Sequence, residues 1–146
     1  MDKVERLKEK TPRFTAWLNL QTSTKKVRPS VLLIDDDETI RKTLSHTLRA
    51  EGFRVDTAPD GSQALQKSRA KLYDVALIDV RLPDMEGTRL LSALREKSPE
   101  MKEIIMTGYP SVKNAVQAID GGAVGYLIKP VDPSDLVAKI REKLGE

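Results

Sequence analysis

Apolar runs of strand length alternate with segments of helical period from residue 31 onward, and this alternation constrains the fold more than any other feature of the sequence. Residues 31–34 and 75–78 are apolar throughout, as in strands that are buried on both faces. The predicted strands are 31–35, 53–58, 74–79, 103–107 and 125–128, and a helix follows each of them, the last four at 61–70, 86–97, 112–119 and 133–144.

Five strand–helix units of this kind predict an α/β fold with three layers, (βα)5, in which helices cover both faces of a parallel sheet. The first helix places Ile40, Leu44 and Leu48 on one face and ends at Gly52. The helix at 112–119 carries apolar residues at positions 112, 115, 116 and 119. We expect each of these stripes to pack into the core.

Charge is distributed unevenly along the chain. Residues 1–30 hold eight Lys or Arg and three Asp or Glu, whereas residues 31–146 hold 17 and 19. We interpret 1–30 as a basic N-terminal arm or linker and 31–146 as one domain. A solubilising tail explains so short a basic segment better than a nucleic-acid site does, so we expect no nucleic acid to bind this chain directly.

Several classes of protein are excluded by what the sequence lacks. It has no cysteine, which rules out disulfides, thiolate metal sites and cysteine nucleophiles. Its apolar runs are far shorter than the ~18 residues of a membrane span. Its first residues lack the apolar segment of a signal peptide. We therefore expect a cytoplasmic protein that does not bind membranes.

Polar residues stand where four of the predicted strands end. Asp35 and Asp36 follow the first strand, Asp79 ends the third, Thr107 ends the fourth and Lys129 follows the fifth. Ligands of open parallel sheets bind at the carboxyl ends of the strands, and carboxylates are costly to bury unpaired. The pattern indicates a charged functional site at this edge of the sheet.

These residues belong to motifs that resemble the receiver domain of two-component response regulators. The motifs, in chain order, are Val31-Leu32-Leu33-Ile34-Asp35-Asp36-Asp37, Asp74 to Asp79 with Leu82-Pro83-Asp84-Met85-Glu86-Gly87 behind it, Ile104-Ile105-Met106-Thr107-Gly108, and Gly121 to Pro130. Each motif alone is weak, but four in this order make the resemblance specific. It implies a flavodoxin-like sheet of strand order 2-1-3-4-5, which brings the ends of strands 1, 3, 4 and 5 together.

The resemblance also implies a phosphoryl-accepting site. Asp36 and Asp79, with the main-chain carbonyl of Arg81, would bind Mg²⁺ directly, and Asp35 would assist through water. Asp79 would be the nucleophile that accepts the phosphoryl group. Lys129 would neutralise charge on the phosphoryl oxygens.

The resemblance further implies that phosphorylation of this site changes a surface that binds other proteins. Thr107 would donate to a phosphoryl oxygen, and Tyr126 would turn inward as Thr107 moves. A sensor histidine kinase or histidine phosphotransfer protein would supply the phosphoryl group. An unidentified protein target, or a second copy in a homodimer, would bind the face of the fourth and fifth helices.

The resemblance therefore implies a signalling domain whose only catalysis is its own phosphorylation and slow autodephosphorylation. Because the chain ends after the predicted fifth helix, we expect no DNA-binding output domain in it. Arg81 and Tyr109, two residues past Asp79 and Thr107, are bulky, and we expect them to hinder water and prolong the phosphorylated state.

Two alternatives are also compatible with the sequence. Residues 35–39 (Asp-Asp-Asp-Glu-Thr) also match the Asp-x-Asp-x-Thr motif of haloacid-dehalogenase-type phosphatases, in which Asp35 would be the nucleophile and Asp37 the acid–base. That interpretation gives Asp79 no role, and we expect Asp37 to cap the first helix instead. A receiver-shaped module that is never phosphorylated is the second alternative, although the sequence has every residue of the implied pocket.

Overall fold

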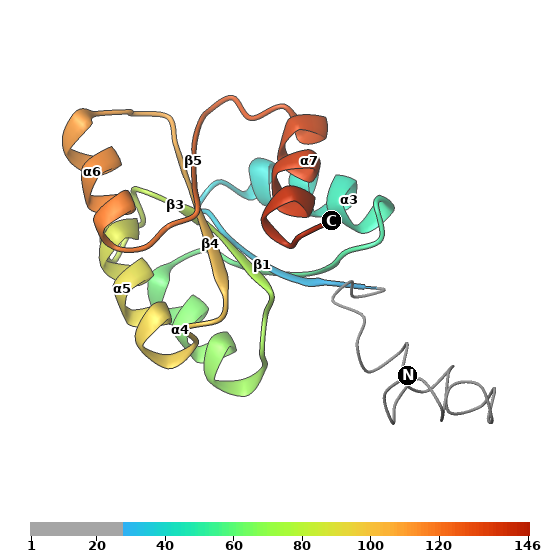
Figure 1. The fold of residues 1–146 in the computed structure, drawn as a ribbon, viewed down its shortest axis with the longest axis horizontal. Coiled ribbons are helices and arrows are strands. Elements are labelled where there is room, and N and C mark those ends of the chain that lie inside the picture. Colours follow the sequence, from blue (N-terminus) through green and yellow to red (C-terminus); the bar gives the residue numbers. More distant parts are fainter. Residues whose placement is uncertain (1–27) are drawn as a thin grey trace, which may run out of the picture.

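The computed structural model describes residues 28–146, which form a five-stranded parallel sheet in the order β2-β1-β3-β4-β5 (Figure 1). The elements are β1 (Ser30–Ile34), α3 (Glu38–Ala50), β2 (Arg54–Ala58), α4 (Gly61–Ala70), β3 (Val75–Asp79), α5 (Gly87–Lys97), β4 (Lys102–Thr107), α6 (Val112–Asp120), β5 (Gly125–Ile128) and α7 (Pro133–Lys143). The predicted α/β class and flavodoxin-like strand order are confirmed. The predicted basic arm lies, up to residue 27, outside the described residues.

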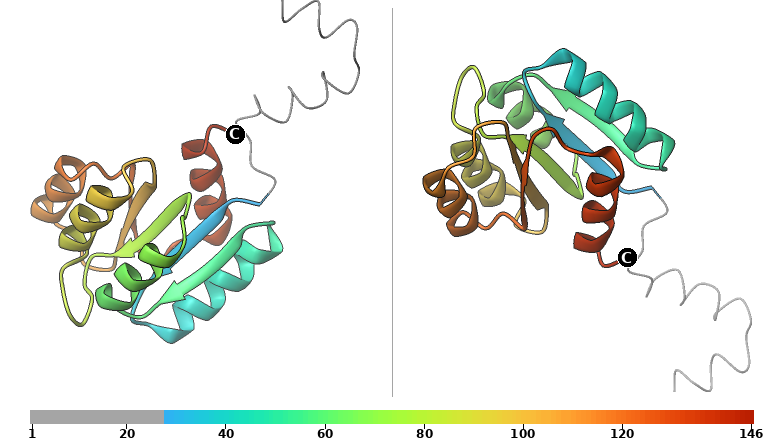
Figure 2. Two further views of the ribbon diagram at one scale, coloured as in Figure 1. Left: turned by 90° about the horizontal axis from the view of Figure 1, so that it is seen from below. Right: turned by 90° about the horizontal axis from the view of Figure 1, so that it is seen from above.

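Two helical layers enclose the sheet, because alternate residues of its inner strands point to opposite faces. Leu33 and Leu77 belong to the apolar cluster under α3 and α7, and Leu32 and Ile78 to the cluster under α4, α5 and α6. Figure 2 shows these helices on either side of the sheet. Each fully buried Leu or Ile contributes about 1.5–3 kcal/mol to folding. None of the helices within residues 28–146 is long and apolar enough to span a membrane.

Short polar residues begin several helices at the carboxyl edge of the sheet. Asp37 accepts a hydrogen bond from the N–H of Ile40 at 3.1 Å, as predicted for a cap of α3. Ser111 and Asp132 begin α6 and α7 in the same way. The caps hold short loops directly after the strands, and these loops carry the polar residues of the site.

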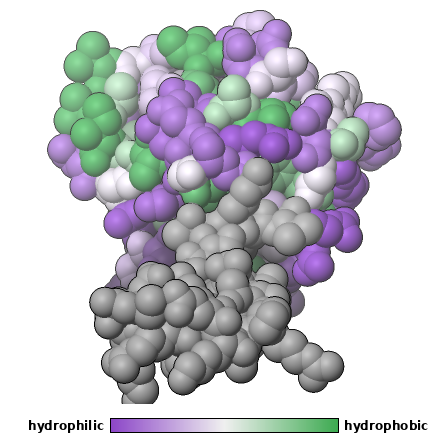
Figure 3. All heavy atoms as spheres, turned by 45° about the vertical axis from the view of Figure 1, so that its right-hand side comes forward, coloured by the Kyte–Doolittle hydropathy of each residue, from purple (hydrophilic) through white to green (hydrophobic). Residues whose placement is uncertain are grey.

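The helix α6 departs from the sequence prediction. Its apolar stripe was expected in the core, but Val112, Val116 and Ile119 are 83%, 47% and 69% exposed, and Ala118 is the buried position. The helix leads into β5, the edge strand, whose Ile128 is itself 58% exposed. No strand lies beyond this edge within the described residues, so the outer side of α6 has nothing to pack against. Figure 3 shows apolar side chains gathered at the upper left, over α6.

A buried ion pair ties β4 to the neighbouring helix. Glu103 is fully buried, and its Oε2 lies 3.0 Å from Nη1 of Arg95 in α5. The same guanidinium donates to the carbonyl of Gly122 at 3.3 Å. Within the described part of the chain, Oε1 of Glu103 has no hydrogen-bond partner. Burial raises the pKa of Glu103 above its ordinary value of 4.5, and Arg95 offsets this in part.

This raised pKa predicts a pH-dependent gain from Glu103→Gln. The folded state holds the Glu103 proton more tightly than the unfolded state does, so the wild type loses stability as the pH rises above about 4.5. Glutamine stays neutral and does not incur this loss. We expect Glu103→Gln to match the wild type in urea unfolding at pH 4 and to exceed it at pH 7. An equal difference at both pH values would contradict the assignment.

Candidate functional site

The candidate site lies at the carboxyl edge of the sheet, where four neighbouring strands end. Asp35 follows β1, Asp79 ends β3, Thr107 ends β4 and Lys129 follows β5. These strands are adjacent in the order β1-β3-β4-β5, at a spacing of about 4.8 Å. The topology therefore brings together side chains that are up to 94 residues apart in the sequence.

Three carboxylates form an acidic cluster in this site. Asp35, Asp36 and Asp79 each offer an oxygen atom, and these oxygens all lie within 4.8 Å of one another. Asp35 is fully buried and Asp79 is 7% exposed, whereas Asp36 faces solvent. Carboxylates this close repel one another unless a cation lies between them. The donor set suits Mg²⁺, which prefers a few carboxylates and retains several waters.

Lys129 supplies the positive charge of the site. Its Nζ donates to Oδ2 of Asp35 at 2.6 Å and to Oδ2 of Asp79 at 3.2 Å. Burial opposes the charge on Lys129, but both carboxylates outweigh it and raise the pKa of the lysine. Burial and the nearby Asp35 raise the pKa of Asp79, while Lys129 lowers it in part. The contact of Lys129 with Asp35 is shorter than its contact with Asp79. The lysine charge therefore neutralises the Asp79 carboxylate less fully than the Asp35 carboxylate.

The backbone around Asp79 is packed tightly. The N–H of Arg81 donates to Oδ1 of Asp79 at 3.3 Å, and the N–H of Gly87 donates to the carbonyl of Val80 at 2.6 Å. A Cβ atom on Gly87 would lie 2.1 Å from the carbonyl oxygen of Asp79. Gly87 is therefore required for the loop after β3 to return beside Asp79. The Leu-Pro-Asp-Met-Glu-Gly motif marked this loop, but its spacing alone did not reveal that contact.

Thr107 and Tyr126, the implied switch pair, lie on neighbouring strands. Thr107 is 1% exposed, and its hydroxyl accepts a hydrogen bond from the N–H of Tyr109 at 2.9 Å. Tyr126 is half-buried, and its hydroxyl donates to the side-chain oxygen of Asn114 in α6. Sequence reasoning missed Asn114. The signal for it was the Ser111-x-x-Asn114 spacing of a capping box.

Arg81 and Tyr109 contact each other at the rim of the site. The guanidinium carbon of Arg81 lies 4.3 Å from the centre of the Tyr109 ring, which is a cation–π contact. Both side chains are exposed, and they join the loop after β3 to the loop after β4. The two bulky residues that the sequence singled out therefore contact each other directly.

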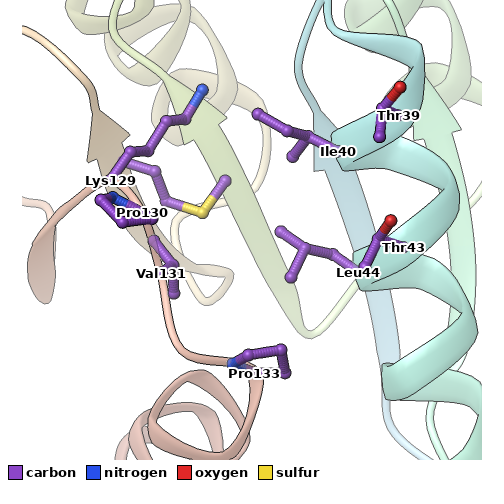
Figure 4. Close-up of a pocket in the computed structure, with 9 residues that line it drawn as sticks. Thr39, Ile40, Thr43, Leu44, Lys129, Pro130, Val131 and Pro133 are labelled. Atoms are coloured by element: carbon purple, nitrogen blue, oxygen red, sulfur yellow. The ribbon is translucent and has the colours of Figure 1, made fainter.

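An apolar groove of about 320 Å³ adjoins Lys129 on the α3 side of the site. Figure 4 shows Ile40 and Leu44 projecting from α3 into the groove, with Lys129, Pro130 and Val131 on the opposite side. The apolar stem of Lys129 lines this groove, while its ammonium group reaches the acidic cluster.

The phosphatase alternative fits these contacts poorly. It needs Asp37 as a free acid–base, but the Asp37 carboxylate accepts the N–H of Ile40 as the cap of α3. It also leaves Asp79 without a task, although Asp79 lies in the acidic cluster with Asp35 and contacts Lys129.

Comparisons with known proteins agree with this geometry. The family model "Response regulator receiver domain" matches residues 31–141. The transcriptional regulatory protein ZraR of Klebsiella oxytoca is 40% identical over 114 residues, which cover 78% of this chain and 26% of that protein. The acid tolerance regulatory protein ActR of Rhizobium meliloti is 33% identical over 117 residues, covering 80% of this chain and 60% of that protein. The chain thus spans about a quarter of one relative and three-fifths of the other.

Solved structures give the same result. A CheY-like receiver domain protein of Methanospirillum hungatei has a TM-score of 0.79 at 41% identity, covering 80% of this chain and 94% of that one. A response regulator of Burkholderia pseudomallei, solved with a phosphorylated aspartic acid and a calcium ion, has a TM-score of 0.75 at 30% identity, covering 80% and 69%.

Proposed function

The chain belongs to the response regulator receiver domain family of two-component systems, and from this premise we propose that Asp79 accepts a phosphoryl group from a phosphohistidine donor with Mg²⁺. The observation that carries the proposal is the position of Asp79, which lies within the acidic cluster and 3.2 Å from Lys129. A carboxylate beside a lysine and a cation site can attack a phosphorus atom without repelling its oxygens.

The proposed step forms one bond and breaks another. An oxygen of Asp79 bonds to phosphorus, and the nitrogen–phosphorus bond to the donor histidine breaks. The donor ring, which carries a proton on its other nitrogen, leaves as a neutral imidazole, and Asp79 becomes an acyl phosphate. Asp36, Asp79 and the carbonyl of Arg81 would hold Mg²⁺ directly, with Asp35 assisting through water, and the ion would offset the charge of the phosphoryl oxygens. Lys129 would bind one of those oxygens, and the Thr107 hydroxyl would donate to another.

Intact mass spectrometry tests this function directly. The protein is incubated with Mg²⁺ and acetyl phosphate or phosphoramidate, whose nitrogen–phosphorus bond mimics phosphohistidine. We expect the wild type to gain one labile phosphoryl group and Asp79→Asn to gain none. A wild type that gains no phosphoryl group from either donor would contradict the proposal. Adduct formation by Asp79→Asn but not by Asp35→Asn would favour the phosphatase alternative.

The Arg81–Tyr109 contact predicts a long-lived phosphorylated state. We propose that this pair hinders the approach of water to Asp79, so removal of either side chain should speed hydrolysis. We expect Arg81→Ala and Tyr109→Ala each to shorten the lifetime by about two- to fivefold, as the loss of one exposed cation–π contact would. The measurement is the decay of the adduct mass after the donor is removed. Lys113→Ala, an exposed change on α6, serves as the control, and an unchanged lifetime in both rim variants would contradict the prediction.

The groove beside Lys129 suits a protein donor. A histidine kinase or phosphotransfer protein must bring its phosphohistidine to Asp79. The groove that Ile40 and Leu44 line is also lined by Lys129, which contacts Asp79. We expect Ile40→Ala to slow transfer from a phosphorylated protein donor by about fivefold while transfer from acetyl phosphate stays unchanged. Equal slowing with both donors would assign Ile40 to the site itself and remove the docking role.

The exposed row of α6 is the candidate output surface. Val112, Val116 and Ile119 form an apolar patch of the kind that marks interaction sites. A solved receiver domain with a TM-score of 0.76 at 34% identity, that of NtrC4 activated with beryllofluoride, is a dimer. We propose that phosphorylation makes the face of α6, β5 and α7 bind a protein target or a second copy. Sedimentation that is the same with and without phosphorylation at high protein concentration would exclude the dimer.

A further inference from the structure

A continuous chain of hydrogen bonds joins the two switch residues, and it passes through Asn114. The hydroxyl of Thr107 accepts the N–H of Tyr109 at 2.9 Å, and the carbonyl of Tyr109 accepts the side-chain N–H of Asn114 at 3.1 Å. The side-chain oxygen of Asn114 then accepts the hydroxyl of Tyr126. We propose that Asn114 is a positioning residue that holds Tyr126 in its half-buried position and couples it to Thr107. This inference rests on the proposed function.

Asn114 is itself fixed by the start of α6. Its backbone N–H donates to the hydroxyl of Ser111 at 3.1 Å, and its side-chain oxygen accepts the N–H of Ser111 at 3.2 Å. This capping box orients the amide, so that one end faces Tyr109 and the other faces Tyr126. The Tyr126 ring packs against the core cluster under α4, α5 and α6, while its hydroxyl is held by the helix. A single amide therefore connects the loop after β4 with the ring on β5.

The coupling follows from which contacts a bound phosphoryl group would compete for. When the Thr107 side chain rotates so that its hydroxyl donates to a phosphoryl oxygen, the hydroxyl oxygen moves away from the N–H of Tyr109. The hydrogen bond between these two groups is then lost. The peptide of Tyr109 is then free to move, and with it the carbonyl that anchors Asn114. Loss of that anchor weakens the hold of Asn114 on Tyr126, and the ring is released to turn inward. Binding of a phosphoryl group at Thr107 is thus coupled to the position of the Tyr126 ring through Asn114.

The Tyr126 ring is in equilibrium between its half-buried position and an inward position. Removal of the Asn114 side chain should shift this equilibrium toward the inward position even without a phosphoryl group. One neutral hydrogen bond changes an equilibrium constant by about two- to tenfold. The coupling between phosphoryl binding and ring position is reciprocal. A protein whose Tyr126 ring already favours the inward position therefore binds a phosphoryl analogue more tightly. We expect Asn114→Ala to bind beryllofluoride with Mg²⁺ about two- to tenfold more tightly than the wild type.

The experiment separates the contact from helix capping. The wild type, Asn114→Ala, Ser111→Ala and Tyr126→Phe are labelled with fluorotyrosine, and the Tyr126 signal is assigned as the one absent from Tyr126→Phe. Ser111→Ala removes one bond of the same capping box but keeps the bond between Asn114 and Tyr126. Without any donor, we expect the Tyr126 fluorine signal of Asn114→Ala to move toward its position in the beryllofluoride-bound wild type. The signal of Ser111→Ala should stay in place.

Two further results decide the inference. Tyr126→Phe lacks the donor hydroxyl, so Asn114→Ala added to Tyr126→Phe should change beryllofluoride affinity no further. The inference is wrong if Asn114→Ala and Ser111→Ala shift the signal equally, or if the Tyr126 signal of Asn114→Ala does not move. A wild type that forms no acyl phosphate would remove the proposed function, while the Tyr126 signal in the unliganded protein would still report whether Asn114 holds the ring.

Discussion

Lys129→Met is expected to slow the phosphorylation of Asp79 by about 100- to 1000-fold, the effect of removing one preorganised charge from a transition state. Lys129 lies 3.2 Å from Asp79 and is the ammonium group held within the acidic cluster. Methionine keeps the apolar stem that lines the neighbouring groove, so the change removes the charge with little loss of packing. The measurement is the rate of adduct formation from acetyl phosphate at saturating Mg²⁺.

Lys139→Met is the matched control for this change. Lys139 lies on α7 and makes a partly exposed contact of 3.9 Å with Glu142, which contributes little. We expect this variant to phosphorylate at the wild-type rate. If Lys129→Met also stayed within about twofold of the wild type, Lys129 would not stabilise the developing charge and its proposed role would be wrong.

Gly87→Ala has the second large expected effect, because its added methyl group would collide with backbone. The new Cβ would lie 2.1 Å from the carbonyl oxygen of Asp79 and 2.9 Å from Cα of Val80. Backbone atoms cannot rotate out of the way as a flexible side chain can, so the loop or β3 must shift. We expect the free energy of unfolding in urea to fall by about 2–3 kcal/mol. The same shift would misplace Asp79 and reduce its phosphorylation.

Gly108→Ala tests whether the effect is specific to this contact. Gly108 follows Thr107 at the same edge of the sheet, but a Cβ there would meet no atom of residues 28–146 within 4 Å. Its backbone also lies outside the left-handed region that favours glycine. We expect Gly108→Ala to unfold as the wild type does. Similar losses in both variants would mean that the steric contact at Gly87 is not the cause.

The order and type of the helices and strands could be predicted because the helix-capping residues and the hydrophobic periodicity indicate the same elements. The helix predicted at 61–70 is α4 (Gly61–Ala70), since Asp60 caps its start and the helical period ends before the next apolar run. The inner strands β1 and β3 were identifiable as apolar runs. The strand order came from the family resemblance, because alternation alone does not say which strands are neighbours.

What lies beyond an element could not be predicted from its own sequence. The apolar period of α6 indicates a helix with an apolar face, but it cannot show that the sheet ends at β5 and leaves that face exposed. The same limit applies to the site. The sequence indicates Asp35, Asp79 and Lys129 because each is a charged residue at the end of a strand. Asn114 is a polar residue on a helix, and its hydrogen-bond partners lie in another loop and another strand, so its own sequence context does not indicate its role.

Reductive trapping of the phosphorylated protein tests the central claim most directly. Borohydride reduces an acyl phosphate to an alcohol, so a phosphorylated aspartate becomes homoserine and can be located by peptide sequencing in a mass spectrometer. After treatment with acetyl phosphate and Mg²⁺, we expect homoserine at position 79. Homoserine at position 35 instead, with residue 79 unmodified, would contradict the assignment of Asp79 as the acceptor.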